Sequence, residues 1–419
     1  MKKFIDNIHI LKDETIIENG FIEIEDGIIS NIGESSNNKA NTLALDLKGK
    51  RILAIPGMIN SHTHSGMAAL KGAGDDLPFE QWLFQTIIPL EEQLDDEMIY
   101  LSTMISQMEM ARNGITTFVD MYMMLDSIIK AVDEFGMRAY ICRGLQDDSL
   151  EDGQRLQKNI KAYEKYHGTA NGRISVGFGP HSPYLCSKEY LKKIADVAQE
   201  LNALIHIHLK ESQKESHQYT FRELANIGLF NTQTIAAHCV YADSDDIQVL
   251  KEFNVSVAHN PSSNLKLANG IAPIEKMHQE GVNVCLGTDS VSSNNSLDLF
   301  KEMLLASLIH KGETKDPQAI PAIVSFKMAT SNGANAVGQK NIGLLEKGMR
   351  ADIAFLDMDN INLFPLIKPI SNIVYSGRGS DVIATMVDGD FIYYFGTYPK
   401  INEEAIKKQF MEKYVKLYK

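Results

Sequence analysis

The chain has 419 residues, 44% of them hydrophobic and 23% charged, which is the balance of a folded globular protein with one large domain or two. Its 41 basic and 54 acidic residues give a formal net charge of −13, and no basic block offsets it, so nucleic acids and anionic membranes are excluded as expected partners. The start "MKKFIDNIHI" lacks an apolar segment of signal-peptide length, and no run of about 18 apolar residues occurs, so we expect a cytoplasmic protein without a membrane partner.

Short antiparallel strands are expected at both ends of the chain. The segments "FIEIEDGIISNIG" and "TLALDLKG" alternate apolar and polar residues, with Gly and Asp at the breaks. The same alternation returns in "DVIATMVDGDFIYYFG", before the amphipathic tail "NEEAIKKQFMEKYVKLYK". We therefore expect residues 1–55 and 345–419 to form one composite β-sandwich domain with a C-terminal helix.

Residues 56–344 carry eight short apolar runs, each followed by a loop and a helix-like segment. The runs are "AIPGMINSHTH", "ITTFVDMY", "RAYICRGL", "ISVGFGPH", "ALIHIHL", "TIAAHCV", "VSVAHNP" and "VNVCLGTD". Alternating strands and helices indicate an α/β fold with a parallel sheet, and eight such units predict a (β/α)₈ TIM barrel. After the first run, Pro89 should kink or end the helical stretch "DLPFEQWLFQTIIPLEEQL".

Metal-ligating side chains gather at the C-terminal ends of the predicted strands, where a barrel of this kind carries its site. Those that close predicted runs are His62, His64, His181, His208, His238, His259 and Asp289. Alternate residues of an extended strand share a face, so His62 and His64 should point the same way. A lone His-x-His pair is more often an ordinary strand end, but this clustering favours a metal site.

We expect one divalent metal, held by His62, His64, His208 and Asp289. Neutral imidazoles with a carboxylate suit Zn²⁺ first and Fe²⁺ as the alternative, and a catalytic site keeps one position open for water. His206 shares a strand face with His208, but His208 lies nearer the C-terminal mouth and is the expected ligand. A second metal is not expected, because the end of the fourth run has neither a lysine nor an acid to bridge two ions.

Glu211 and His238 are the expected catalytic side chains. Glu211 follows His208 by three residues, so its carboxylate could remove a proton from activated water and pass it to the substrate. His238 could polarise the substrate or stabilise charge at the attacked centre. The simpler alternatives are a solvated carboxylate in "LKESQKES" and a core histidine.

Ordered motifs run through nearly the whole chain: "PGMINSHTHSGMAALKGAGDDLPFEQWL", "QMEMARNGITTFVDMY", "GFGPHSPYLCS", "IHLKES", "IAAHCV", "HNPSSNLKLANGIAP" and "LGTDSVSSNNSLDLF". In these motifs the chain resembles the amidohydrolase superfamily and, within it, the 5′-methylthioadenosine/S-adenosylhomocysteine deaminases. The resemblance implies the same four metal ligands and makes Glu211, His238 and Asp289 catalytic. It also implies a set of substrate contacts: Trp82, Glu91, Arg143, Arg155, His181 and Glu211.

Glu91 in this resemblance would hold the ribose hydroxyls, His181 would donate to the purine ring, and Trp82 would pack near the ligand. Each has a simpler interpretation, as a surface helix charge, a polar strand end and a core aromatic residue.

Arg143 and Arg155 match the arginines that pair with the homocysteine carboxylate in the family. Asp147, Asp148 and Asp152 are near them in the sequence, so ordinary ion pairs are an equally good interpretation. Only S-adenosylhomocysteine, and not methylthioadenosine, carries that carboxylate.

The implied reaction is hydrolytic deamination of a purine nucleoside, namely S-adenosylhomocysteine, 5′-methylthioadenosine or adenosine, to the inosine analogue and ammonia. Metal-activated water would attack C6 of the adenine ring, and Asp289 would help to protonate the leaving amino group. The alternatives are a sister deaminase or chlorohydrolase acting on guanine, cytosine or an s-triazine, and a barrel that only binds a nucleoside. We also expect a homo-oligomer, and we expect the four scattered cysteines to be reduced, semi-buried thiols.

Overall fold

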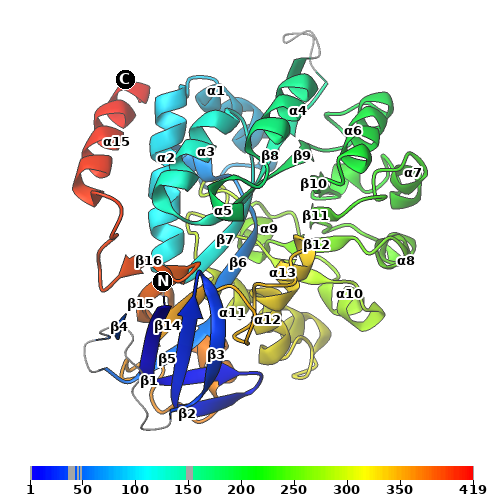
Figure 1. The fold of residues 1–419 in the computed structure, drawn as a ribbon. Helices are drawn as coiled ribbons and strands as arrows, with labels where there is room; N and C mark the ends of the chain where they lie inside the picture. Colours follow the sequence, from blue (N-terminus) through cyan, green and yellow to red (C-terminus); the bar gives the residue numbers. More distant parts are fainter. Residues whose placement is uncertain (1, 36–42, 45–46, 48–49, 148–153, 419) are drawn as a thin grey trace.

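Two eight-stranded sheets organise the chain, one from its middle and one from its two ends (Figure 1). The structure is a computed structural model and describes residues 2–35, 43–44, 47, 50–147 and 154–418. The predicted fold class, an α/β barrel with a smaller β-structure built from both chain ends, is confirmed.

The barrel strands lie in chain order, and each pairs in parallel with the next. They are β6 Met58–Thr63, β7 Ile115–Tyr122, β8 Arg138–Leu145, β9 Ile174–Pro180, β10 Ile205–Leu209, β11 Thr234–His238, β12 Ser256–His259 and β13 Val284–Leu286. Every residue of β7, β10 and β11 is buried, because helices cover the outer face and the inner faces pack on one another. These strands match the eight predicted runs.

Hydrogen bonds just beyond β13 join the last strand of the barrel to the first. The backbone N–H groups of Thr288 and Asp289 both donate to the carbonyl oxygen of His62, at 3.1 and 2.9 Å. The Asn60 side chain accepts from the Thr288 N–H at 3.0 Å and donates to the Thr288 hydroxyl at 2.7 Å. Closure of the barrel thereby places Asp289 beside His62.

Helices form the outer layer of the barrel (Figure 1). The longer ones are α2 Asp96–Arg112, α3 Leu125–Phe135, α4 Gln154–Tyr166, α6 Lys188–Glu200, α8 Ser244–Glu252 and α11 Leu299–Thr314. The shorter ones are η1 Ser65–Leu70, α5 Thr169–Gly172, η3 Gln213–Glu215, α7 Phe221–Asn226, α9 Pro261–Lys266, α10 Ile274–Glu280, α12 Ala322–Met328 and α13 Ser331–Ala336. Side chains such as Asp95, Ser187 and Asp243 accept backbone N–H groups and so define where α2, α6 and α8 begin.

The helical stretch after β6 is broken, as Pro89 predicts. A π-helical segment, η2 Gln81–Ile87, is followed by the short helix α1 Ile88–Glu91, which has Pro89 in its first turn. Proline has no N–H to continue the preceding ladder, so a new helix starts there. Trp82 and Ile87 are buried.

The second sheet has the order β16-β15-β14-β5-β1-β2-β3, with β4 paired to β1. Its strands are β1 Lys2–Lys12, β2 Thr15–Glu25, β3 Ile28–Glu34, β4 Leu43–Ala44, β5 Ile52–Pro56, β14 Ile353–Asp357, β15 Val382–Val387 and β16 Asp390–Tyr394. Strand β5 pairs in parallel with β1 and antiparallel with β14, so it joins the two chain ends. Alternating apolar residues of these strands, such as Ile5, Ile22 and Phe355, form a hydrophobic core separate from that of the barrel.

The remaining helices follow β14 and β16. They are α14 Pro369–Tyr375, η4 Gly379–Asp381 and α15 Glu403–Leu417. Helix α15 lies beside α2 (Figure 1), where Lys413 pairs with Asp95 and Glu97 at 2.6 Å each. Across the described part of the chain, no helix combines the length and the apolar composition needed to cross a membrane.

The four cysteines are free thiols, as predicted, and all four are buried. They are Cys142, Cys186, Cys239 and Cys285, with exposed fractions between 0% and 4%. They are therefore core residues rather than the semi-buried thiols that we expected.

Candidate metal centre and active site

A cavity of about 260 Å³ lies at the C-terminal ends of the barrel strands. Its wall contains most of the predicted site residues: His64, Trp82, Glu91, Arg155, His181, His208, Glu211, His238 and Asp289. Apolar side chains from the segment after β6, including Phe79, Leu83 and Ile87, form another part of the wall. The cavity thus joins an apolar wall to a group of imidazoles and carboxylates.

Three predicted metal ligands, His62, His64 and Asp289, meet beside this cavity. Oδ1 of Asp289 lies 3.4 Å from Nε2 of His62 and 3.2 Å from Nε2 of His64. Two ligands that each lie about 2.1 Å from one ion at a tetrahedral angle are about 3.4 Å apart, so these spacings suit a shared cation. Nε2 of His62 is buried and has no hydrogen-bond partner among the described residues, as expected of an atom that coordinates a metal.

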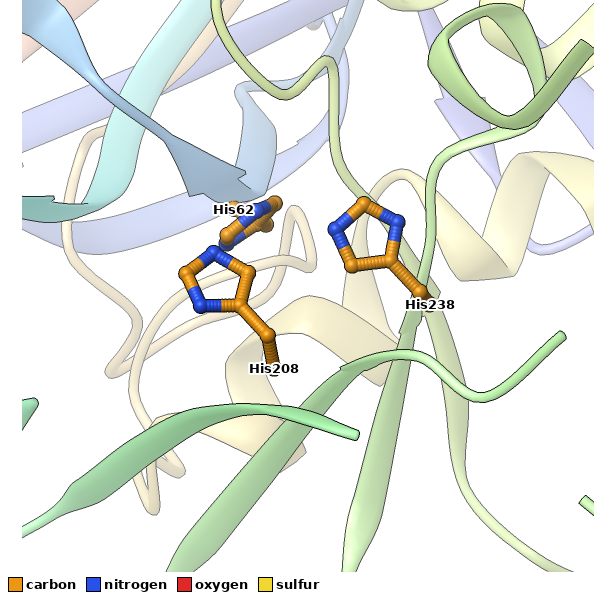
Figure 2. A group of neighbouring side chains, drawn as sticks. All are labelled: His62, His208 and His238. Atoms are coloured by element: carbon orange, nitrogen blue, oxygen red, sulfur yellow. The ribbon is translucent and has the colours of Figure 1, made fainter. Parts of the chain in front are cut away.

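His208 joins the same group through His62. The ring nitrogens of His62, His208 and His238 that could hold an ion lie within 4.8 Å of one another. Figure 2 shows these three rings, which come from β6, β10 and β11, arranged around a common space. Imidazole and carboxylate donors in this number fit a borderline divalent cation such as zinc or ferrous iron.

Backbone carbonyl groups determine the tautomers of His64 and His208. Nδ1 of His64 lies 2.6 Å from the carbonyl oxygen of Met121, and Nδ1 of His208 lies 2.7 Å from that of His181. A carbonyl oxygen can only accept, so both Nδ1 atoms carry the proton. When the ring is neutral, each of these histidines therefore carries its lone pair on Nε2, the atom that metal binding requires.

Asp289 is held by serines that the sequence analysis did not single out. Its backbone is in the left-handed region, with φ of 59°, directly after the barrel closure. The hydroxyls of Ser263 and Ser293 donate to its Oδ2 at 2.6 and 3.1 Å, and the Ser290 N–H donates to Oδ1 at 2.7 Å. Burial opposes ionisation, but the adjacent histidines keep the pKa of Asp289 well below its ordinary value.

Glu211 and His238 lie next to each other at the edge of this group. Nε2 of His238 is 3.8 Å from Oε2 of Glu211 and 3.9 Å from Oδ2 of Asp289, and its Nδ1 donates to the Asn264 amide oxygen at 2.8 Å. The other oxygen of Glu211 accepts from the Asn269 amide at 3.1 Å. Burial raises the pKa of Glu211 to about 7, so this carboxyl can both take up and release a proton near neutral pH.

The predicted substrate contacts His181, Glu91 and Trp82 all line the cavity. Burial and the neighbouring imidazoles lower the pKa of His181 to about 3, which keeps its ring neutral. Burial raises the pKa of Glu91, and the nearby Tyr122 hydroxyl opposes that effect. Trp82 packs against Phe79, with ring centroids 5.9 Å apart.

The two predicted arginines differ in position. Arg155, at the start of α4, lines the cavity, whereas Arg143, near the end of β8, is half-buried and does not belong to the cavity wall. Asp148 and Asp152, the acidic neighbours that made an ion-pair role possible, lie outside the described residues.

Two further histidines of the predicted strand ends take other positions. The ring of His259 lies 5.5 Å from that of His310 on α11 and is absent from the cavity wall. His206 is fully buried, and its Nε2 lies 2.9 Å from Nδ1 of His62. The sequence placed His206 on the face of His208 but gave no signal that its ring contacts another strand's ligand.

Known proteins resemble this chain over nearly its full length. The amidohydrolase family pattern matches residues 53–392. A 5-methylthioadenosine/S-adenosylhomocysteine deaminase of Thermotoga maritima is 46% identical over 390 residues, which cover 93% of each chain. One from Thermoanaerobacter pseudethanolicus is 40% identical over 405 residues, 94% of each chain. The crystal structure of an adenosine deaminase from Xanthomonas campestris with bound zinc superposes with a TM-score of 0.93 at 26% identity, covering 99% of this chain and 98% of that one.

Proposed function

Because this chain belongs to the amidohydrolase family, we propose that it is a metal-dependent hydrolase that removes the amino group of adenine nucleosides. The substrates would be S-adenosylhomocysteine, 5′-methylthioadenosine and adenosine, each converted to its inosine analogue with release of ammonia. Relatives with that name at 46% and 40% identity support this substrate class. The observation that carries the proposal is the buried carboxyl of Glu211 beside the group of His62, His64 and Asp289 at the cavity.

The residues that would hold the cation are His62, His64, His208 and Asp289. Zinc is the proposed metal, and the zinc in the similar adenosine deaminase structure supports that choice. When bound there, a divalent cation supplies a Lewis acid that makes water a nucleophile at neutral pH.

Glu211, His238 and Asp289 would handle the protons and the developing charge. Glu211 takes a proton from the attacking water and delivers it to the ring nitrogen next to the attacked carbon, a role that its pKa of about 7 suits. His238 presents Nε2 to the reacting carbon and stabilises charge that develops there. The proton left on the attacking oxygen moves through Asp289 to the amino group, which departs as ammonia.

The cavity wall would hold the rest of the nucleoside. Glu91 accepts hydrogen bonds from the ribose hydroxyls, and His181 faces the purine ring. Trp82 supplies apolar contact, while Arg155 pairs with the carboxylate of an amino-acid tail. Arg143 could add a second positive charge from β8.

A turnover panel tests this assignment. Ammonia release is measured for S-adenosylhomocysteine, methylthioadenosine, adenosine, guanine and cytosine, with protein loaded with zinc or with iron. We expect the highest kcat/KM for one of the three adenine nucleosides. Faster release from guanine or cytosine, or chloride release from a chlorinated triazine, would contradict the substrate class, and binding of nucleoside without any turnover would contradict the enzymatic role.

A further inference from the structure

His206 is not a predicted ligand, but its ring contacts the predicted ligand His62 in a way that the other ligand histidines do not share. The Nδ1 atoms of His64 and His208 donate to backbone carbonyls, whereas Nδ1 of His62 faces the Nε2 of another imidazole at 2.9 Å. The His62 and His206 rings are perpendicular, at 89°, with centroids 4.8 Å apart. Both side chains are fully buried.

This pair can be protonated in two ways, because an imidazole nitrogen can be a donor or an acceptor. In one arrangement His206 Nε2–H donates to His62 Nδ1, and the His62 proton is on Nε2, where it faces Asp289 Oδ1 at 3.4 Å. In the other, His62 Nδ1–H donates to His206 Nε2. Only the second arrangement leaves a lone pair on His62 Nε2 for a metal.

We propose that His206 is a positioning residue that accepts from His62 Nδ1–H and so selects the metal-binding tautomer and orientation of His62. The inference rests on the proposed metal centre. In the metal-bound state the proton of His206 is on its Nδ1, which is buried and has no hydrogen-bond partner among the described residues. The partners of His64 and His208 are backbone carbonyls, so among the three ligand histidines only His62 has an Nδ1 partner that a side-chain substitution can remove.

Two substitutions of similar size distinguish the role of His206 as a hydrogen-bond acceptor from its role in packing. His206→Gln keeps an oxygen that can only accept near the place of Nε2, and His206→Met fills similar space without that acceptor. We expect His206→Met to weaken zinc binding about 10- to 100-fold, the usual effect of losing the partner of a metal-bound histidine, and His206→Gln to stay within about threefold of the wild type. His310→Phe, at another buried histidine without contact to a predicted ligand, is the control and should leave zinc affinity unchanged.

The measurement is the zinc dissociation constant by chelator competition, with thermal melting of the metal-free proteins to verify folding. Equal affinity of the Met and Gln variants would overturn the inference, because packing would then account for any loss. If the Met variant does not fold, a tenfold or larger loss in the folded Gln variant would also overturn it. A wild type that binds neither zinc nor iron would instead overturn the proposed function together with this inference.

Discussion

For single residues, the geometry of the site depends on which atom of each side chain is already engaged in a hydrogen bond. Carbonyl oxygens hold Nδ1 of His64 and His208, and serine hydroxyls hold one oxygen of Asp289. The atoms that remain face a common space, so little reorganisation is needed when a cation binds. The imidazoles of His62 and His64 lie 3.4 and 3.2 Å from Asp289 and keep its pKa low. The imidazole of His238 is 3.8 Å from Glu211, and there burial prevails and raises the pKa.

Replacing Glu211 by Gln should lower turnover by about two to four orders of magnitude, the usual contribution of a general acid and base. The amide keeps the size and the Asn269 contact but cannot take up a proton. Metal content should stay near that of the wild type, as measured by elemental analysis alongside kcat. Near-normal turnover with the metal retained would show that Glu211 does not carry the proton.

Arg155→Met should raise KM for S-adenosylhomocysteine at least tenfold, the scale of one lost charge-assisted hydrogen bond, with a much smaller effect on methylthioadenosine. The reason is that only the first substrate has a carboxylate, and Arg155 lines the cavity. Arg143→Met is the comparison variant and should raise KM for S-adenosylhomocysteine less than Arg155→Met does, since Arg143 is not part of the cavity wall. Equal losses on both substrates for Arg155→Met would argue against the charge pairing.

At the scale of elements, the site is assembled where β13 meets β6. Gly287 follows β13 and packs directly against His62. A Cβ atom at this glycine would lie 2.3 Å from Asn260 Oδ1 and 2.7 Å from His62 Cβ. The close approach of these two segments allows Asp289 to reach His62, on β6, and His64, which follows it.

Gly287→Ala should therefore push the two segments apart. We expect a loss of about 1 to 3 kcal/mol in the free energy of unfolding from overpacking, and at least a tenfold loss of zinc affinity because Asp289 moves away from His62 and His64. Gly312→Ala on the exposed side of α11 is the matched control, since an added Cβ there meets no atom within 4 Å. It should stabilise the helix by up to about 1 kcal/mol and leave zinc binding unchanged.

Helix α11 is tied to the loops around the site by a fully buried acid, Glu302. It accepts from the Ser262 N–H at 3.0 Å, the Ser262 hydroxyl at 2.6 Å and the Asn294 amide at 2.9 Å. Burial nevertheless raises the pKa of Glu302 to about 7. The folded state therefore holds this proton more tightly than the unfolded state.

The contribution of Glu302 to stability should be complete below pH 4.5 and should decline as the pH rises through 7. The loss of unfolding free energy over this pH range should be at most about 3 kcal/mol, because the pKa of Glu302 rises from 4.5 to about 7 on folding. Glu302→Gln mimics the protonated form at every pH. In urea titrations the unfolding free energy of the wild type should therefore match that of the variant at low pH and fall below it as the pH rises through 7, whereas a difference that does not change with pH would mean that Glu302 titrates normally.

At the scale of the whole molecule, a buried cluster of charges joins the barrel to the second sheet. Arg138, on β8, contacts Asp352 at 2.9 and 3.2 Å and Asp388 at 2.6 Å, and Arg350 also reaches Asp388, at 3.2 Å. Asp352 precedes β14 and Asp388 follows β15, so one guanidinium connects the barrel to both returning strands.

Arg138→Met should cost about 3 to 5 kcal/mol of unfolding free energy, because it leaves buried carboxylates without their counter-charge. Zinc affinity of the folded variant should not change, since the cluster lies away from the cavity. Arg222→Met, which removes an exposed pair with Glu252, should leave thermal unfolding unchanged. Equal melting temperatures for wild type and Arg138→Met would show that the cluster contributes little.

Much of this architecture could be predicted from local patterns. Short apolar runs alternating with helical stretches predict a parallel barrel, and the strand bounds agree closely, as in β7 and β8, because periodicity and turn residues act over a few neighbours. The end of each strand also locates candidate ligands such as His62 and His208. Their roles as ligands, and the boundaries of the two predicted domains, stay predictions.

Contacts between different strands were decided only by the tertiary structure. The stagger and closure of the barrel bring His206 into contact with His62, and Ser263 into contact with Asp289. They also place Arg155, rather than Arg143, in the cavity wall. The ring of His259 packs against that of His310 instead of lining the cavity. These pairs are separated by up to 144 positions, and no local periodicity encodes the distance between two strands. Local sequence patterns therefore identify which chemical groups lie at the mouth of the barrel, whereas the packing of all eight strands sets which atoms of those groups face one another.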